Sequence, residues 1–241
     1  AVVTGSMALG SEGLFRPGVR AAGSSGAFGY HLSANHFHTD GWRDHSEATR
    51  NVGNLRLDWK GVGGGDWMLV ANTMKLRADD PLGLNRTQFE ADPRGVAPVA
   101  LTFNTRKTVE QSQVGLVNEH PLAPGHKLRL MAYFGERETV QFQSIPPDPQ
   151  INNERHPGGV IDLQRGYGGA DVRWTWQAAP FELVAGLSYD RLTEERRGWE
   201  NFIGPLLGVQ GDLRRDEDNT VSSLDPYLQG VWEPDHRWTV S

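Results

Sequence analysis

Two histidines at alternate positions, His36 and His38, are the first residues in this sequence whose spacing could support chemistry. On a β-strand such residues point to the same side, and Asp40, Asp44 and His45 follow closely in the chain. Imidazole nitrogens and carboxylate oxygens are ligands for a divalent metal such as zinc. The alternative is a polar strand end that runs into a loop. We favour the alternative, because the spacing matches no strong ligand pattern, and predict no metal site.

Asp79, Asp80, Glu90 and Asp92 form a second polar segment. The segment lacks the central glycine and the regularly spaced oxygens of a calcium-binding loop, so we interpret it as a structured loop. The glycine-rich residues 61–66 are interpreted as a turn, because neither a Lys-Ser/Thr pair nor a helix follows them. No catalytic arrangement stands out among the eight histidines and thirty acidic residues. The sequence therefore predicts no enzyme, no catalytic residue and no cofactor.

A set of basic, amide and aromatic side chains in the expected loops is better suited to binding a small molecule. Arginine can bind a carboxylate through two parallel hydrogen bonds, and tryptophan can stack on a planar ring. Each residue alone is better explained as a solvated loop or lumen residue paired with one of the abundant acids, but the set marks the best place for a ligand. The candidate ligand-binding residues are Trp42, Arg43, Arg106, Lys107, Arg137, Gln141, Gln143, Arg196, Arg197 and Trp199.

Composition excludes several classes of protein. The formal net charge is -6 and basic residues are spread along the chain, unlike a nucleic-acid-binding surface, which gathers them on one face. The absence of cysteine excludes disulfides, cysteine-type zinc sites and thiol catalysis. Mean hydropathy is -0.52 and no stretch of eighteen apolar residues occurs, so membrane-spanning helices are excluded. Glycine, at 29 residues, is about 12% of the chain against a usual ~7%, which favours strands and turns.

Apolar and polar residues alternate along much of the chain, as in β-strands with one apolar face. In 27–38, for example, Phe28, Tyr30 and Leu32 alternate with Gly29, His31 and Ser33. The pattern predicts about eleven strands, each near the ~9–11 residues that cross a bilayer at a tilt. The clean segments are 27–38, 54–59, 128–135, 170–176 and 181–190, and the less regular ones are 2–8, 13–22, 66–77, 108–119, 221–232 and 237–241.

The connections between these segments alternate between short and long. A bacterial outer-membrane barrel has short turns at one rim and long loops at the other. The alternative is a soluble all-β domain, but long loops without structure of their own are uncommon in compact domains. The expected short turns are 23–26, 61–66, 120–125, 177–180 and 233–236, and the expected long loops are 39–50, 78–107, 137–165 and 192–220.

Eight segments in order and spacing resemble the barrel of TonB-dependent outer-membrane receptors, most closely those assigned to pyrroloquinoline quinone uptake, which are related to ferric-citrate and other ferric-siderophore receptors. The resemblance covers almost the whole chain. The segments are TDGWRDHS at 39–46, ADDPLGLNRTQFEADPR at 78–94, NTRKTVEQ at 104–111, GERETVQFQSIPPDPQ at 135–150, GGVIDLQRGYGG at 158–169, RRGWENF at 196–202, GDLRRDEDN at 211–219 and SLDPYLQ at 223–229.

The resemblance implies an all-β, antiparallel, up-and-down transmembrane β-barrel of 22 strands around a plug. Residues 1–241 would form part of that barrel, with the plug and the C-terminal strands outside the sequence, and no secretory signal is found at residue 1. It further implies a Gram-negative outer membrane, contact with its lipid, energy from TonB-ExbB-ExbD through the plug, and import of a small anionic ligand such as pyrroloquinoline quinone or a ferric-siderophore-type chelate. No nucleic acid is expected as a partner.

Two other functions remain open at this point, a passive outer-membrane porin or binding barrel and a soluble β-rich enzyme or lectin. The receptor interpretation makes three structural predictions. The apolar faces should point outward and the polar faces inward, without a second sheet packed on Leu55, Leu128, Leu183 or Leu187. The long loops should share one end, and the sheet should be curved and open, with its first and last strands at free edges.

Overall fold

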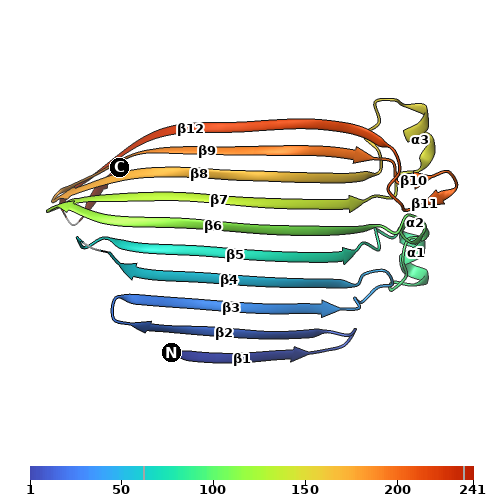
Figure 1. The fold of residues 1–241 in the computed structure, drawn as a ribbon, viewed down its shortest axis with the longest axis horizontal. Helices are drawn as coiled ribbons and strands as arrows, with labels where there is room; N and C mark the ends of the chain where they lie inside the picture. Colours follow the sequence, from blue (N-terminus) through green and yellow to red (C-terminus); the bar gives the residue numbers. More distant parts are fainter. Residues whose placement is uncertain (62, 236) are drawn as a thin grey trace.

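Residues 1–61, 63–235 and 237–241 are described by a computed structural model of the chain (Figure 1). Val62 and His236, which belong to the expected turns 61–66 and 233–236, lie outside the described residues. The strands of the main sheet are β1 (Val2–Leu9), β2 (Phe15–Ser25), β3 (Phe28–Thr39), β4 (Ala48–Lys60), β5 (Asp66–Asp79), β6 (Arg106–Ala123), β7 (His126–Phe142), β8 (Val160–Ala178), β9 (Phe181–Trp199), β12 (Leu213–Asp235) and β13 (Trp238–Val240).

Each strand of this sheet pairs antiparallel with the next one in the chain. Over the described residues the sheet has eleven strands in the order β1 to β9, then β12 and β13. The short hairpin β10 (Phe202–Ile203) and β11 (Leu206–Leu207) forms a separate two-stranded sheet in the β9–β12 connection. The predicted antiparallel all-β architecture and the open sheet with β1 and β13 at its edges are confirmed.

The pairing register places the apolar residues of different strands on one face of the sheet. Leu32 pairs with Leu55, Leu55 with Ala71, and the row continues to Val114 and Phe134. Because side chains alternate between faces, the neighbours of these residues form the opposite, polar face. The apolar segments predicted from alternation thus share one continuous surface.

Burial shows which face is the inner one. On the polar face Asp171 and Glu194 are 8% and 9% exposed, whereas on the apolar face Phe134 is 54% and Leu187 45% exposed. Curvature crowds side chains on the inside of a wall, so the polar face is the concave face and the apolar face the convex face. No second sheet packs on the convex face in the described part of the chain. Apolar outside and polar inside is the distribution of a membrane β-barrel.

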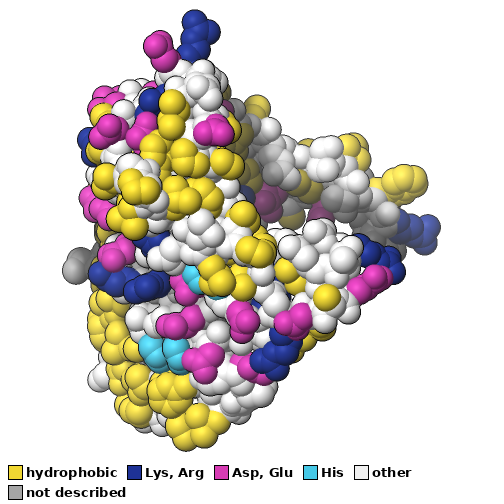
Figure 2. Space-filling view, turned by 90° about the vertical axis from the view of Figure 1, so that its right-hand side faces the viewer, with side chains coloured by type: hydrophobic (Ala, Val, Ile, Leu, Met, Phe, Trp, Pro, Cys, Tyr) yellow, Lys and Arg dark blue, Asp and Glu magenta, His cyan; other side chains and the backbone are white. Residues whose placement is uncertain are grey.

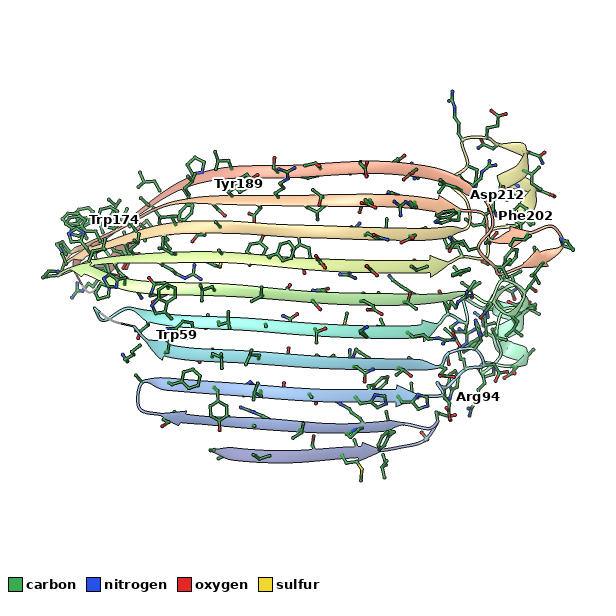
Figure 3. All side chains as sticks on the ribbon, viewed as in Figure 1. Trp59, Arg94, Trp174, Tyr189, Phe202 and Asp212 are labelled. Atoms are coloured by element: carbon green, nitrogen blue, oxygen red, sulfur yellow. The ribbon has the colours of Figure 1, made fainter. Side chains whose placement is uncertain are left out.

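Aromatic side chains mark the end of the sheet where the short turns lie (Figure 3). Trp59 and Trp67 stack on the convex face with ring centroids 5.8 Å apart, and His126 and Trp174 stack at 5.6 Å. Tyr189 lies on the same face, nearer to the turn end than to the loop end. Aromatic residues of this kind form the girdles at the two interfaces of a membrane barrel. Residues 190–199 of β9 then continue for about 33 Å beyond this level, at about 3.3 Å per residue.

All long connections lie at the opposite end of the sheet (Figure 1), as predicted. They are shorter than expected, because the strands extend far into segments predicted as loops. In these extensions both faces of a strand carry mostly polar side chains, so the alternation of apolar and polar residues on which the prediction depended is absent there. The expected loops 39–50, 78–107, 137–165 and 192–220 are replaced by connections at 40–47, 80–105, 143–159 and 200–212.

Three short helices in these connections were not predicted, namely α1 (Arg86–Ala91), α2 (Pro98–Thr102) and α3 (Pro147–Asn152). The first has a sequence signal, because Asn85 accepts from the Gln88 backbone N–H while the Gln88 side chain accepts from the Asn85 N–H, a capping box. The helices of the described residues are too short to cross a bilayer.

Candidate functional site

The connections 40–47, 80–105, 143–159 and 200–212 pack into a layer over the loop end of the sheet, which we call the cap (Figure 2). Most of the buried apolar side chains of the described chain belong to it or to the strand ends beneath it. A sheet with its apolar face outward has no core of its own, so the cap supplies one. Its buried apolar residues are Ala97, Ala100, Phe103, Val160 and Phe202.

Arg43, a predicted ligand-binding residue, holds two connections of the cap together. Its guanidinium donates from Nε to the Gly95 carbonyl at 3.0 Å, from Nη1 to Leu82 at 2.7 Å, and from Nη2 to Pro81 at 3.3 Å. These bonds join the 40–47 and 80–105 connections. The neighbouring Trp42 is 52% exposed and lies 5.8 Å from the Arg94 guanidinium, so its ring remains accessible.

A buried amide pair holds the other half of the cap. Asn201, fully buried, donates to the carbonyls of Gln143 and Ile145 at 2.7 and 3.0 Å and accepts from Gln150 Nε2 at 2.7 Å. Arg214 donates to the Gln150 carbonyl at 2.7 Å. The predicted residue Gln143 thus contributes its backbone to this network. Neither Gln150 nor Asn201 was predicted, because nothing local distinguishes a buried amide from a solvated one.

Four predicted residues, Lys107, Arg137, Gln141 and Arg196, lie on the concave face below the cap. Lys107 pairs with Gln141 across β6 and β7. Arg137 pairs with Gln111 on one side and with Arg165 on the other. These residues come from adjacent strands and face the same space, and we call this set, with Gln113, Arg165, Tyr167 and Glu194, the concave site.

The concave site contains more cationic than anionic side chains, so its cations are not all paired with acids of the site. The Arg165 guanidinium forms an ion pair with the buried Glu194 carboxylate. Arg137 Nε is buried and, among the described residues, has no hydrogen-bond partner. An unpaired buried donor is costly, so an anion placed between Arg137 and its neighbours would be stabilised. Tyr167 donates to Gln113 at 2.9 Å and closes the lower edge of the site.

Glycines let aromatic side chains lie flat on the concave face. A Cβ on Gly135 would come within 2.5 Å of the Tyr167 ring, and one on Gly186 within 2.2 Å of the Tyr227 ring. Tyrosine covering the bare backbone of a paired glycine compensates for the missing side chain in the sheet. The tyrosines were missed in the sequence, although continuing the alternation of 170–176 toward the N-terminus would have placed Arg165 and Tyr167 on the polar face.

The remaining predicted residues do not face the concave site. Arg106 lies on the convex face with its guanidinium 3.5 Å from the centroid of the Phe142 ring, and burial, with the nearby Arg77, lowers its pKa. Arg197, also convex, pairs with Glu195 at 3.0 Å and with Asp216 at 3.5 Å. Trp199 ends β9, and its buried indole N–H has no partner among the described residues.

The histidines considered for a metal make other contacts. His36 is 2.7 Å from Asn51 Oδ1, His38 is 3.3 Å from Asp40, and His45 is 2.8 Å from the Thr105 carbonyl. Within the ranges that the structure describes, no group of three or more His, Asp or Glu side chains is arranged to hold a metal ion.

No protein-family profile matches the sequence. The fold is similar to solved structures of transporters and uptake receptors. The copper transporter OprC shares 16% identity at a TM-score of 0.71, with 98% of this chain and 34% of that chain covered. For the ferric yersiniabactin uptake receptor FyuA from Yersinia pestis the values are 12%, 0.74, 99% and 38%.

The ferric citrate transporter FecA, in its unliganded form, shares 14% identity at a TM-score of 0.63, with 98% of this chain and 42% of that chain covered. This chain therefore spans about a third to two fifths of the length of these proteins. None of the three is an enzyme. The chain has the fold of part of these transporter and receptor chains.

Proposed function

We propose that residues 1–241 are part of the barrel of a TonB-dependent receptor in the outer membrane of a Gram-negative bacterium. The similarity to about 34–42% of three transporter and receptor chains supports a longer protein, in which a plug and further strands complete the barrel. Energy would come from TonB-ExbB-ExbD through the plug. The protein imports a scarce, small anionic ligand rather than forming a passive pore.

The concave site is the observation that supports an anionic ligand. The buried Nε of Arg137 has no hydrogen-bond partner in the described structure. Arg165 lies opposite Arg137 on the next strand, and Lys107 and Arg196 extend the positive surface. Guanidinium groups bind carboxylates with matched geometry, and the exposed Trp42 ring in the cap is suited to stacking on a planar molecule. Pyrroloquinoline quinone, a planar polycarboxylate, fits both features. It is the ligand we propose, ahead of ferric citrate.

The test is uptake of labelled pyrroloquinoline quinone and of ferric citrate by cells that express the full-length protein, with and without a protonophore. We expect saturable uptake of pyrroloquinoline quinone that the protonophore abolishes. Uptake that survives the protonophore indicates a passive pore, and saturable uptake of ferric citrate alone replaces the proposed ligand.

A matched pair of variants tests the concave site. Arg196→Ala and Arg197→Ala remove the same side chain from adjacent positions on opposite faces of β9. Loss of a charge-assisted bond of ~1.5–3 kcal/mol predicts roughly a tenfold or greater loss of apparent affinity for Arg196→Ala. Arg197→Ala, whose salt bridges are largely exposed, should change it by less than about twofold. Equal losses in both would contradict the concave site.

A further inference from the structure

Two tyrosine rings lie against the backbone of the concave face, next to the arginines of the concave site. The first belongs to Tyr167 of β8, which crosses over Gly135 of β7 and donates its hydroxyl to Gln113 of β6 at 2.9 Å. A Cβ on Gly135 would meet this ring at 2.5 Å, so the ring lies directly on the glycine backbone. One side of the Tyr167 ring therefore covers the wall, and the other side faces the space inside it.

Tyr133 provides the second ring, by the same arrangement in the opposite direction. It starts on β7, crosses Gly169 of β8, where a Cβ would lie 2.7 Å from the ring, and donates to the Asp190 carboxylate of β9. The centroids of the Tyr133 and Tyr167 rings are 6.5 Å apart, with 47° between the ring planes. Both tyrosines are half-buried, as expected when only one side of each ring is covered. We call these two rings, which together extend from β6 to β9, the tyrosine strip.

The pairing register places the tyrosine strip directly beside the arginines. Arg137 and Arg165 face each other across β7 and β8, and Gly135 and Tyr167 form the next pair on the same face. Tyr133 belongs to the pair after that. Each step is two residues, so the Cα atoms of the arginines and of the farther tyrosine are separated by about 13 Å along the strands, at about 3.3 Å per residue.

The charge of the concave face changes sign along the tyrosine strip. At the arginine end Arg165 is already paired with Glu194, whereas the buried Nε of Arg137 has no hydrogen-bond partner among the described residues. At the other end Asp190 places a carboxylate beside the Tyr133 ring. A ligand carboxylate is attracted to the first end and repelled from the second, which fixes the direction in which a bound anion lies.

We propose that the tyrosine strip is the stacking surface for a planar, conjugated anion and makes the concave site selective for this class of ligand. The ring system of the ligand lies against Tyr167 and Tyr133, and a carboxylate at its edge accepts from Arg137. Aromatic systems prefer offset or tilted packing, and rings whose hydroxyls are already hydrogen-bonded need little reorganisation when a ligand binds. This inference rests on the proposed function, because it names the ligand class of the same site.

The alternative is that the rings only cover the glycines and have no ligand. The two readings differ in their response to ligand shape. A flexible carboxylate can reach Arg137 but offers no flat face to the rings, so it gains nothing from them. A planar carboxylate of equal charge gains the stacking contact in addition to the ion pair.

The experiment is calorimetric titration of the full-length protein in mild detergent with three compounds. They are pyrroloquinoline quinone, trimesate, which is a planar benzene tricarboxylate, and tricarballylate, which is a flexible propane tricarboxylate. We expect trimesate to bind at least about fivefold more tightly than tricarballylate, since stacking of a planar ring on an aromatic side chain contributes at least that factor. Pyrroloquinoline quinone, with the larger ring system, should bind more tightly than either.

Variants separate the rings from the arginine and from stability. Tyr167→Leu keeps an apolar side chain over Gly135 without the ring and should bring the ratio of the two tricarboxylate affinities close to one. Tyr167→Phe keeps the ring without the bond to Gln113 and should retain most of the preference. Arg137→Ala should weaken both tricarboxylates alike and leave their ratio unchanged. Tyr189→Leu, the same substitution on the convex face, is the matched control and should change neither affinity.

Equal affinity for the two tricarboxylates in the wild-type protein, or a planar preference that Tyr167→Leu leaves intact, would overturn the inference. A preference lost equally in Tyr167→Leu and Tyr167→Phe would assign it to the hydroxyl instead of the ring face and would also contradict it. Binding of pyrroloquinoline quinone without a planar preference removes only the tyrosine strip. Binding of trimesate in preference to tricarballylate, without binding of pyrroloquinoline quinone, supports the strip and removes the proposed ligand.

Discussion

The two faces of β6 to β9 differ in charge at the loop end, over residues 106–112, 136–142, 160–166 and 193–199, although the same strands form both. The concave face carries four cationic residues and one anionic residue, and the convex face five anionic and two cationic residues. Successive side chains of a strand point to opposite faces, and here they differ in charge rather than in hydrophobicity. The concave set is Lys107, Arg137, Arg165, Arg196 and Glu194, and the convex set is Glu110, Glu136, Glu138, Asp162, Glu195, Arg106 and Arg197.

The two faces also differ in how deeply their charged side chains are buried. On the concave face nearer the turn end, Asp171 is buried and accepts from Tyr227 at 3.0 Å and from Arg129 at 3.4 Å. On the convex face the Lys75–Glu110 pair is more than half exposed on both sides. Charges of the concave face therefore contribute to structure through buried contacts, whereas the Lys75–Glu110 pair of the convex face is solvated.

The largest expected effect is on stability. Asp171→Ala leaves Arg129 and Tyr227 without their shared partner and should lower the free energy of unfolding by about 3 kcal/mol, as for a broken buried pair. Glu110→Ala should lower it by less than about 1 kcal/mol. Urea unfolding of the full-length protein in detergent micelles measures both. Similar values for the two variants would remove the energetic contrast between the faces.

Exchanging two adjacent charges tests directly whether the face on which each charge lies matters. Arg137→Glu combined with Glu138→Arg keeps the net charge and reverses the two faces at one level of β7. We expect uptake affinity for an anionic ligand to fall roughly tenfold or more, because one charge-assisted contact of ~1.5–3 kcal/mol becomes repulsive. The single change Glu138→Arg is the control. Unchanged uptake in the double variant would show that net charge, rather than its placement, matters.

Salt concentration should have a smaller effect on ligand affinity than the charge exchange. Attraction of an anion to the concave cations is screened over a Debye length of ~8–10 Å at physiological salt, so ligand affinity should fall as sodium chloride is raised from low to physiological concentration. Arg196→Ala should flatten this dependence, and Arg197→Ala should leave its slope unchanged. Binding isotherms at several salt concentrations give the slopes. A steeper slope for Arg196→Ala would contradict the assignment of faces.

The smallest effect concerns pH. Burial, against the opposing effect of Arg197, raises the pKa of the Asp162 carboxyl on the convex face above its ordinary 3.8. A raised carboxyl pKa favours the folded state most at pH below 3.8, and that contribution is lost as pH rises through the folded-state pKa. Asp162→Asn should therefore raise the unfolding midpoint slightly at pH 7 and have no effect at pH 3. A lower midpoint at pH 7 would contradict this.

The sequence predicted the turn-end half of the fold better than the loop-end half. Where one face is apolar and the other polar, alternation is clear, as at Leu55 and Leu187, and both segments are strands with an outward apolar face. In the loop-end half both faces carry polar side chains, so the pattern predicts loops at residues such as Arg137 and Glu195, which lie in strands. Periodicity can report a strand only where its two faces meet different solvents.

The candidate site was only partly predictable for a related reason. Residue type marked Arg43, Arg137 and Arg197 equally, but their roles depend on surroundings that lie far away in the sequence. Arg43 finds carbonyls at 81, 82 and 95, and Arg197 finds Asp216 on the next strand. Only the parity of the strand could have separated Arg196 from Arg197, and that parity was hidden by the loop assignment.

The pairing of every main-sheet strand with its neighbour in the chain has a kinetic consequence. Contacts between β2 and β3 or between β8 and β9 close through turns of two residues, so each hairpin can zip from its turn without waiting for distant segments. The 80–105 connection closes more slowly, since each doubling of loop length costs ~0.6 kcal/mol of closure entropy, but it still joins neighbouring strands. The wall can therefore grow by one hairpin at a time, each new hairpin templated on the edge of the last.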